Sequence, residues 1–202
     1  MIAVLTSATF FGCVSVIAIQ ISRAVCAGVV PADDGPRSGR PPYAVLVGGS
    51  AVVGGLLLAT GTTPLQLGTA AIVLFALVAC WCSDTTCGIV PDVFTLAPLA
   101  ALLLFAFAQR EWGVAFSASI PFAPFAAAAL FSRGYGMGWG DAKLAALAGA
   151  AIGAPLAVVS LCGACIAAAI GYRLARKRHR PIAFAPYIAA ATAIALPLGL
   201  AR

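Results

Sequence analysis

Two aspartates are the residues in this chain most suited to catalysis. Asp84 follows an apolar run that ends in CWCS, and Asp141 stands between the glycine-rich stretch GMGWG and a second apolar run. An ionisable side chain at a bilayer boundary is costly to bury and is therefore a functional candidate. Two carboxyls held close together share a proton, so one can activate water while the other polarises a carbonyl group. This pattern predicts the chemistry of an aspartic protease.

The elements that position these aspartates are predicted to be transmembrane helices. The chain of 202 residues is 62% hydrophobic and 9% charged, with a mean hydropathy of +1.05. These values exclude an ordinary soluble domain and predict an all-α, polytopic membrane bundle that forms a single domain over residues 1–202. Segments long enough to span a bilayer are expected at about 1–21, 44–60, 66–83, 93–109, 114–132, 141–154, 155–172 and 183–201.

The basic residues predict how this bundle is oriented. Lys and Arg are retained preferentially on the cytoplasmic side. With eight spans and the N terminus outside, two of the 12 basic residues, Arg110 and Arg202, fall outside. The other ten fall inside: Arg23, Arg37, Arg40, Arg133, Lys143, Arg173, Arg176, Lys177, Arg178 and Arg180. The net charge of +6 is then explained by topology and by attraction to lipid headgroups, and it requires no nucleic-acid partner.

This orientation brings the two aspartates to one membrane face. Asp84 would close the third span and Asp141 would open the sixth, both at the cytoplasmic boundary. Gly138 and Gly140 are expected to allow an unusual backbone and the close approach of another chain, such as an extended peptide. Asp92 is expected to cap the helix that follows it. For Lys143 two interpretations stay open: it extends to the interface, or it orients the substrate or the aspartate pair.

The seven cysteines are interpreted mainly as packing residues. Cys162 and Cys165 form a C-x-x-C inside an apolar segment, without the two further ligands of a structural zinc site. Cys80 and Cys82 point to different faces of one helix. Small, weakly polar side chains suit close helix packing in lipid, with a metal site and a disulfide as the alternatives. We expect no metal and no organic cofactor.

Three motifs in order resemble the type IV prepilin peptidases, which are membrane aspartic proteases of the GxGD type. They are Asp84 followed by IVPD (89–92), GMGWGDAKLAALAGA (136–150), and PIAFAPY (181–187). The resemblance covers about residues 66–195. It implies that Asp84 and Asp141 are catalytic and that Pro91 and Pro186 support the site.

The same resemblance implies a substrate and a location. The expected reaction removes the short basic leader of type IV prepilins or of pseudopilins of type II secretion, at the cytoplasmic face of a bacterial inner membrane. Many members of that family carry a zinc-binding cytoplasmic domain after the first helix and also methylate the new N terminus. Here the corresponding loop, 22–43, holds one cysteine, Cys26. This indicates a short form without that domain and argues against methyltransferase activity.

Two other classes of function use the same residues. In a small proton-coupled transporter, Asp84 and Asp141 would form a relay, but such sites usually lie near the bilayer midplane. The boundary position favours the protease. In an inactive scaffold of a pilus or secretion assembly, replacing either aspartate with asparagine would leave function intact.

Overall fold

The computed structural model describes residues 2–29, 41–132, 137–174 and 183–200. These described residues form eight α-helices and contain no strand, so the expected all-helical bundle is confirmed. The helices are α1 (Ile2–Val29), α2 (Tyr43–Ala59), α3 (Pro64–Cys87), α4 (Asp92–Ala108), α5 (Gly113–Phe131), α6 (Trp139–Ile152), α7 (Ala154–Leu174) and α8 (Ala185–Leu200).

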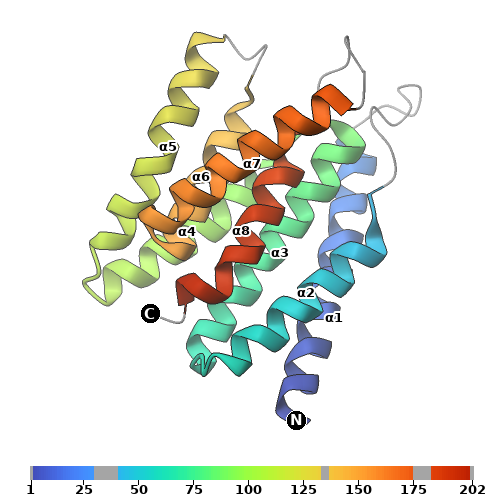
Figure 1. The fold of residues 1–202 in the computed structure, drawn as a ribbon, viewed down its shortest axis with the longest axis vertical. Coiled ribbons are helices and arrows are strands. Elements are labelled where there is room, and N and C mark those ends of the chain that lie inside the picture. The colour runs from blue at the N-terminus through green and yellow to red at the C-terminus, as the bar shows by residue number, and fades with distance from the viewer. Residues whose placement is uncertain (1, 30–40, 133–136, 175–182, 201–202) are drawn as a thin grey trace.

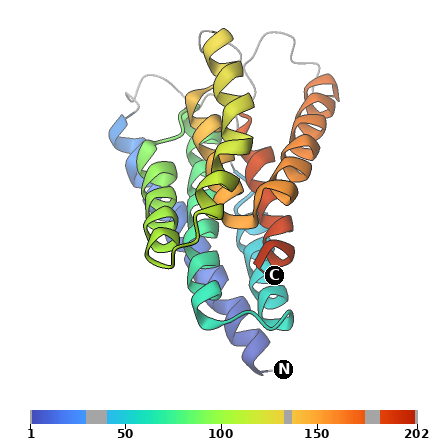
Figure 2. The same cartoon turned by 90° about the vertical axis from the view of Figure 1, so that its left-hand side faces the viewer.

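Successive helices run in alternating directions, so the described ends of the chain lie at one end of the bundle (Figures 1 and 2). The last turn of α3 and the first turns of α6 and α8 lie at the opposite end. This second end contains both aspartates and is called the aspartate end below. The predicted juxtaposition of the third and sixth helical segments is therefore observed.

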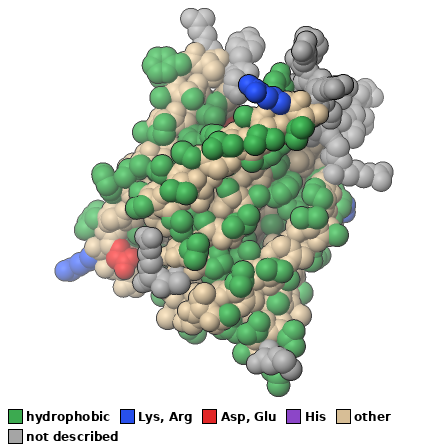
Figure 3. All heavy atoms as spheres, in the orientation of Figure 1, with side chains coloured by type: hydrophobic (Ala, Val, Ile, Leu, Met, Phe, Trp, Pro, Cys, Tyr) green, Lys and Arg blue, Asp and Glu red, His purple; other side chains and the backbone are tan. Residues whose placement is uncertain are grey.

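The surface of the bundle is that of a multi-pass membrane protein. Four helices, α1, α3, α5 and α7, are long and apolar enough to cross a bilayer, and α2, α4 and α8 are shorter apolar helices. Large apolar side chains are widely exposed, and Figure 3 shows them spread along the helices, with the visible charged side chains toward the two ends of the bundle. Burial in lipid, which needs no polar helix face, explains this pattern.

Helix α3 lies at the centre of the bundle and packs against α1, α2, α4, α6 and α8. Its middle is fully buried at Val73, Leu74 and Leu77. Helix α6 is the shortest, and it is buried on nearly every side, as a helix apolar around its whole circumference should be. At Gly149 an added Cβ would collide with the α5 backbone at Ser117, so glycine permits this close helix contact.

Helices α1 and α3 are longer than predicted, and α3 ends at Cys87 rather than at residue 83. Helix α1 continues to Val29 rather than ending at residue 21, so the predicted loop 22–43 is wrong in its first part; residues 30–40 lie outside the described residues. Neighbouring helices bind the polar residues of this extension. The Ser22 hydroxyl donates to the Ala79 carbonyl at 3.2 Å, and the Arg23 guanidinium lies 4.3 Å from the centre of the Tyr43 ring.

Candidate active site

Asp84 lies in the last turn of α3, inside the helix rather than after it. The helix ends at Cys87, and Gly88 follows in the left-handed conformation with φ 67°. The Gly88 N–H donates to the Asp84 carbonyl oxygen at 3.0 Å, which closes the helix end in the way that favours glycine. The Asp84 side chain is half-buried at the aspartate end.

The Asp84 carboxyl is held by the start of a different helix. Its Oδ2 atom accepts a hydrogen bond of 2.9 Å from the N–H of Ala185, the first residue of α8. The first amides of a helix have no partner within the helix, and a helix N terminus favours a negative charge. Asp84 therefore caps α8 from a helix that lies 101 residues away in sequence.

Asp141 is held by the start of its own helix. It is the third residue of α6 and is 9% exposed. Its Oδ2 atom accepts a hydrogen bond of 3.3 Å from the N–H of Gly138, which precedes the helix. The carboxyl thus satisfies one of the free amides at this helix start.

The two carboxyls lie within electrostatic reach of each other. The charge of Asp141 acts on Asp84, and both charges act on the thiol of Cys80, one helical turn before Asp84. The structure therefore brings together the two aspartates that the sequence singled out. Two carboxyls in such an arrangement can hold a single proton between them and so provide a base and an acid at the same time.

Asp92 and Lys143 also come together, and the predicted capping role of Asp92 is wrong. Pro91 occupies the N-cap of α4, with φ −64° and ψ 137°, and no side chain caps this helix. The Asp92 carboxylate instead forms an ion pair with the Lys143 ammonium, which comes from the first turns of α6. Lys143 is thus engaged with a neighbouring helix start.

The two motif glycines have different roles from those expected. Gly138 has an ordinary extended backbone, with φ −80° and ψ 150°, and an added Cβ would meet no atom closer than 3.5 Å. At Gly140 an added Cβ would lie 2.6 Å from the Cβ of Val90. The chain that approaches Gly140 closely is therefore the IVPD turn of the protein itself.

Aromatic side chains that sequence reasoning missed position the start of α8. The ring of Phe184 stacks on Phe125 of α5 at 6.1 Å, and Tyr187 lies 6.5 Å from Phe184. Pro186 is the second residue of α8 and directly follows the amide that binds Asp84. The three aromatic residues were visible in the sequence, but no spacing rule links α5 to α8. Pro181 and Ile182 of the predicted motif lie outside the described residues.

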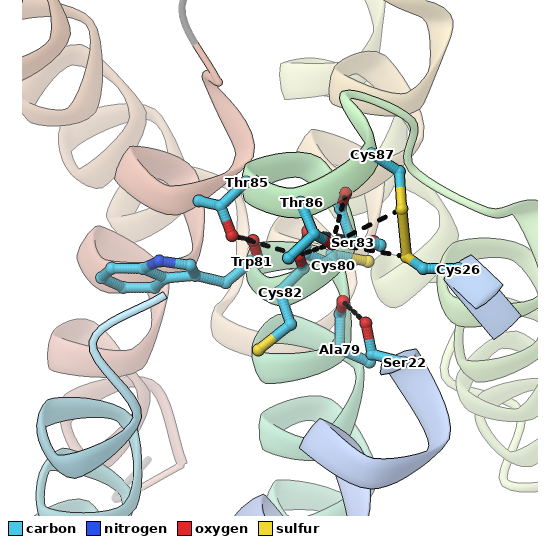
Figure 4. Close-up of a disulfide and its surroundings, with 10 residues drawn as sticks. All are labelled: Ser22, Cys26, Ala79, Cys80, Trp81, Cys82, Ser83, Thr85, Thr86 and Cys87. Atoms are coloured by element: carbon cyan, nitrogen blue, oxygen red, sulfur yellow. Dashed lines mark hydrogen bonds between the residues drawn. A yellow bond between two sulfur atoms is a disulfide. The ribbon is translucent and has the colours of Figure 1, made fainter. Parts of the chain in front are cut away.

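Cys26 and Cys87 form a disulfide between the ends of α1 and α3 (Figure 4), so the packing interpretation is wrong for this pair. Their Cα atoms are 6.3 Å apart, and Cys87 lies one turn beyond Asp84. The other described cysteines are free: Cys80 and Cys82 are buried, and Cys13, Cys162 and Cys165 are exposed. Within the part of the chain that the structure describes, no three metal-ligating side chains converge.

The described basic side chains are unevenly divided between the two ends. Arg23, Lys143 and Arg173 belong to helix turns at the aspartate end, whereas Arg110 lies in the turn between α4 and α5 at the opposite end. The remaining basic residues counted for the topology lie outside the described residues: Arg37, Arg40, Arg133, Arg176, Lys177, Arg178, Arg180 and Arg202.

The chain matches the model of a known family. The model of the type IV leader peptidase family matches residues 70–172. The matched region contains both aspartates, the IVPD turn and Lys143, and it ends before α8. A search of curated proteins and a search of solved structures found no match.

Proposed function

The chain belongs to the type IV leader peptidase family, and from this membership and the geometry of the aspartate pair we propose that it is an aspartic endopeptidase. Asp84 and Asp141 are its catalytic residues, and the substrates are type IV prepilins or pseudopilins. The observation that carries the proposal is that the last turn of α3, with Asp84, and the first turn of α6, with Asp141, lie at one end of the bundle, where the charge of Asp141 acts on Asp84. GxGD-type chemistry needs no metal ion or organic cofactor.

The proposed mechanism uses one proton shared by the pair. The ionised carboxyl removes a proton from water as the water oxygen attacks the carbonyl carbon of the leader junction, and the protonated carboxyl donates to the carbonyl oxygen. When the intermediate collapses, a proton passes to the leaving amide nitrogen and the C–N bond breaks. Because the titration belongs to the pair, the separation between the carboxyls governs how efficiently this cycle runs.

We propose that the aspartate end faces the cytoplasm of a bacterial cell, with the N terminus outside and the bundle in the inner membrane. The excess of described cations at this end supports that orientation. The Cys26–Cys87 disulfide favours the opposite orientation, because disulfides are rare in the cytoplasm. We give the charges more weight, since the basic leader of a prepilin is itself cytoplasmic.

The proposal covers the chain as a single membrane domain, with a peptidase core at about residues 66–195 and lipids as its surroundings. A prepilin has an apolar N-terminal helix, which can lie in the bilayer while its leader junction reaches the aspartate end. We do not extend the proposal to N-methylation, because the segment after α1 is too short for the zinc-binding domain associated with that activity.

The alternatives are distinguished by position and by mutation. A proton-coupled transporter is expected to place its carboxyls near the midplane of the bilayer, whereas Asp84 and Asp141 lie in a last and a first helical turn. An inactive scaffold would not depend on either carboxyl.

The test is leader removal in cells that co-express this protein with a prepilin. Asp84→Asn and Asp141→Asn keep the size of the side chain but remove the acid. Each should reduce the cleavage rate by at least about 10³-fold, within the range for loss of general acid–base catalysis. A gel that resolves precursor from mature pilin measures the effect.

Glu111→Gln is the matched control, because it removes an exposed acid from the turn at the opposite end of the bundle. It should cleave at the wild-type rate. Cleavage by either aspartate variant at more than a tenth of the wild-type rate, or uncleaved precursor with membrane-inserted wild type, would contradict the proposal.

A further inference from the structure

A four-residue turn, residues 88–91, joins α3 to α4. Helix α3 carries Asp84, and α4 packs against α6, the helix that carries Asp141. After Asp84 the chain leaves α3 within one turn, at Gly88, and α4 begins at Asp92. The conformation of this turn is closely specified at both ends. Gly88 adopts the left-handed conformation that favours glycine, and Pro91 holds φ at −64° as the N-cap of α4.

The same turn contacts the first turn of α6 on both sides of Asp141. Val90 packs against Gly140, the residue before Asp141, where even a methyl group would collide. Asp92 pairs with Lys143, two residues after Asp141. One short segment is thus fixed to Asp84 through α3 and to Asp141 through two contacts with α6.

We propose that residues 88–92 act as a brace that sets the separation between the two catalytic carboxyls, with Asp92 and Lys143 as positioning residues that do not touch the substrate. This inference rests on the proposed function, because it explains how the proposed pair is held. It also gives the IVPD motif a positioning role. Val90 packs against α6 before Asp141, and the Asp92–Lys143 ion pair joins the turn to α6 after Asp141.

The ion pair is suited to positioning rather than to stabilising the fold. The side chains of Asp92 and Lys143 are 60% and 24% exposed, and exposed ion pairs contribute little to folding stability. Catalytic rates respond much more steeply to geometry, since a displacement of about 1 Å can cost about 100-fold. Removing the Asp92–Lys143 ion pair should therefore lower the turnover rate while leaving the protein folded.

The experiment measures prepilin cleavage by purified protein in lipid nanodiscs. Asp92→Asn and Lys143→Met should each lower kcat about tenfold and leave KM within about twofold of wild type. This loss is smaller than the 100-fold that a displacement of about 1 Å can cause, because the Val90 contact remains. The double variant should be no worse than either single variant, because both break one interaction. Lys143→Arg keeps the ion pair and should restore kcat to within about threefold of wild type.

Two further measurements separate positioning from folding and from general electrostatics. The thermal midpoint of the single variants should stay within about 2 °C of wild type, as expected for an exposed pair. Arg173→Met removes an exposed cation from the last turn of α7, at the same end but outside the brace, and should leave kcat unchanged.

The possible results point to different conclusions. A raised KM in Lys143→Met with normal Asp92→Asn kinetics would assign Lys143 to substrate binding and overturn the brace. Wild-type kcat in both variants would also overturn it, while Asp84→Asn and Asp141→Asn still tested the proposed function. If the wild type cleaves nothing, infrared titration of the carboxyls decides: the brace predicts weaker coupling between Asp84 and Asp141 in Asp92→Asn, and unchanged coupling refutes it.

Discussion

The two aspartates are held in different ways. Asp141 accepts a hydrogen bond from Gly138, three residues earlier, so its support belongs to the first turn of α6. Asp84 accepts its hydrogen bond from Ala185, in a helix far along the chain, so its support depends on how α3 and α8 pack. One carboxyl is placed by local structure and the other by tertiary structure.

This difference identifies what each carboxyl is sensitive to. A change within the first turn of α6 should act mainly on Asp141, whereas any shift of α8 should act on Asp84. The brace between Asp84 and Asp141 couples the two sites, so it is the place where a small change should have the largest effect on both.

The largest effect is expected from Gly140→Ala. The added methyl group would overlap Val90 and push the IVPD turn away from α6, which should lower cleavage by roughly 100-fold through misplacement of the pair. Gly138→Ala is the matched control: its methyl group would make only ordinary contacts, and activity should stay within about twofold of wild type because surface changes of this kind are nearly neutral.

A second substitution at Val90 checks the cause of that loss. Combining Gly140→Ala with Val90→Gly removes the overlapping atoms, including the Cβ of Val90, and should recover a large part of the lost rate. Equal losses for the two glycine variants, or no recovery in the double variant, would show that steric contact with Val90 is not the reason for glycine at position 140.

A smaller effect is expected from removing the remote support of Asp84. Ala185→Pro deletes the N–H that binds Asp84 at a helix position that tolerates proline. It should lower cleavage about tenfold, in line with the loss of one hydrogen bond to a charged group. Ala185→Val, which adds similar bulk at this buried position and keeps the N–H, is the matched control for the same assay.

The corresponding change on the other carboxyl is Gly138→Pro. The backbone at this residue, with φ −80°, accommodates proline, and its hydrogen bond to Asp141 is longer, 3.3 Å against 2.9 Å. We therefore expect a smaller loss than for Ala185→Pro. The reverse order would mean that the local support matters more than the remote one.

The sequence predicted the helices and the aspartate pair because both follow from local patterns. Apolar length sets the spans, and the alternation of span directions places Asp84 and Asp141 at one end. Helix ends were less predictable: the loop was expected to begin at residue 22, yet Ser22 and Arg23 belong to α1, where they contact α3 and α2.

The supports of the pair were not predictable from local patterns because they connect distant segments. The Asp84–Ala185 hydrogen bond, the Asp92–Lys143 ion pair and the Cys26–Cys87 disulfide each join two helices. Asp92 fits the local rule for a helix cap, but the Lys143 ammonium of a neighbouring helix binds its carboxylate instead. A close approach of another chain segment to Gly140 was expected. The segment was predicted to be an extended peptide such as a substrate, whereas in the structure it is Val90 of the protein itself.

Infrared titration of the carboxyl groups in nanodiscs tests the central claim most directly. The wild type, Asp84→Asn and Asp141→Asn are compared in the carboxyl stretching region. If the two aspartates share a proton, replacing either one should move the titration of the other by more than about one pH unit, the mark of a strongly interacting pair. If each carboxyl titrates identically with and without its partner, the two do not form a catalytic pair and the account is wrong.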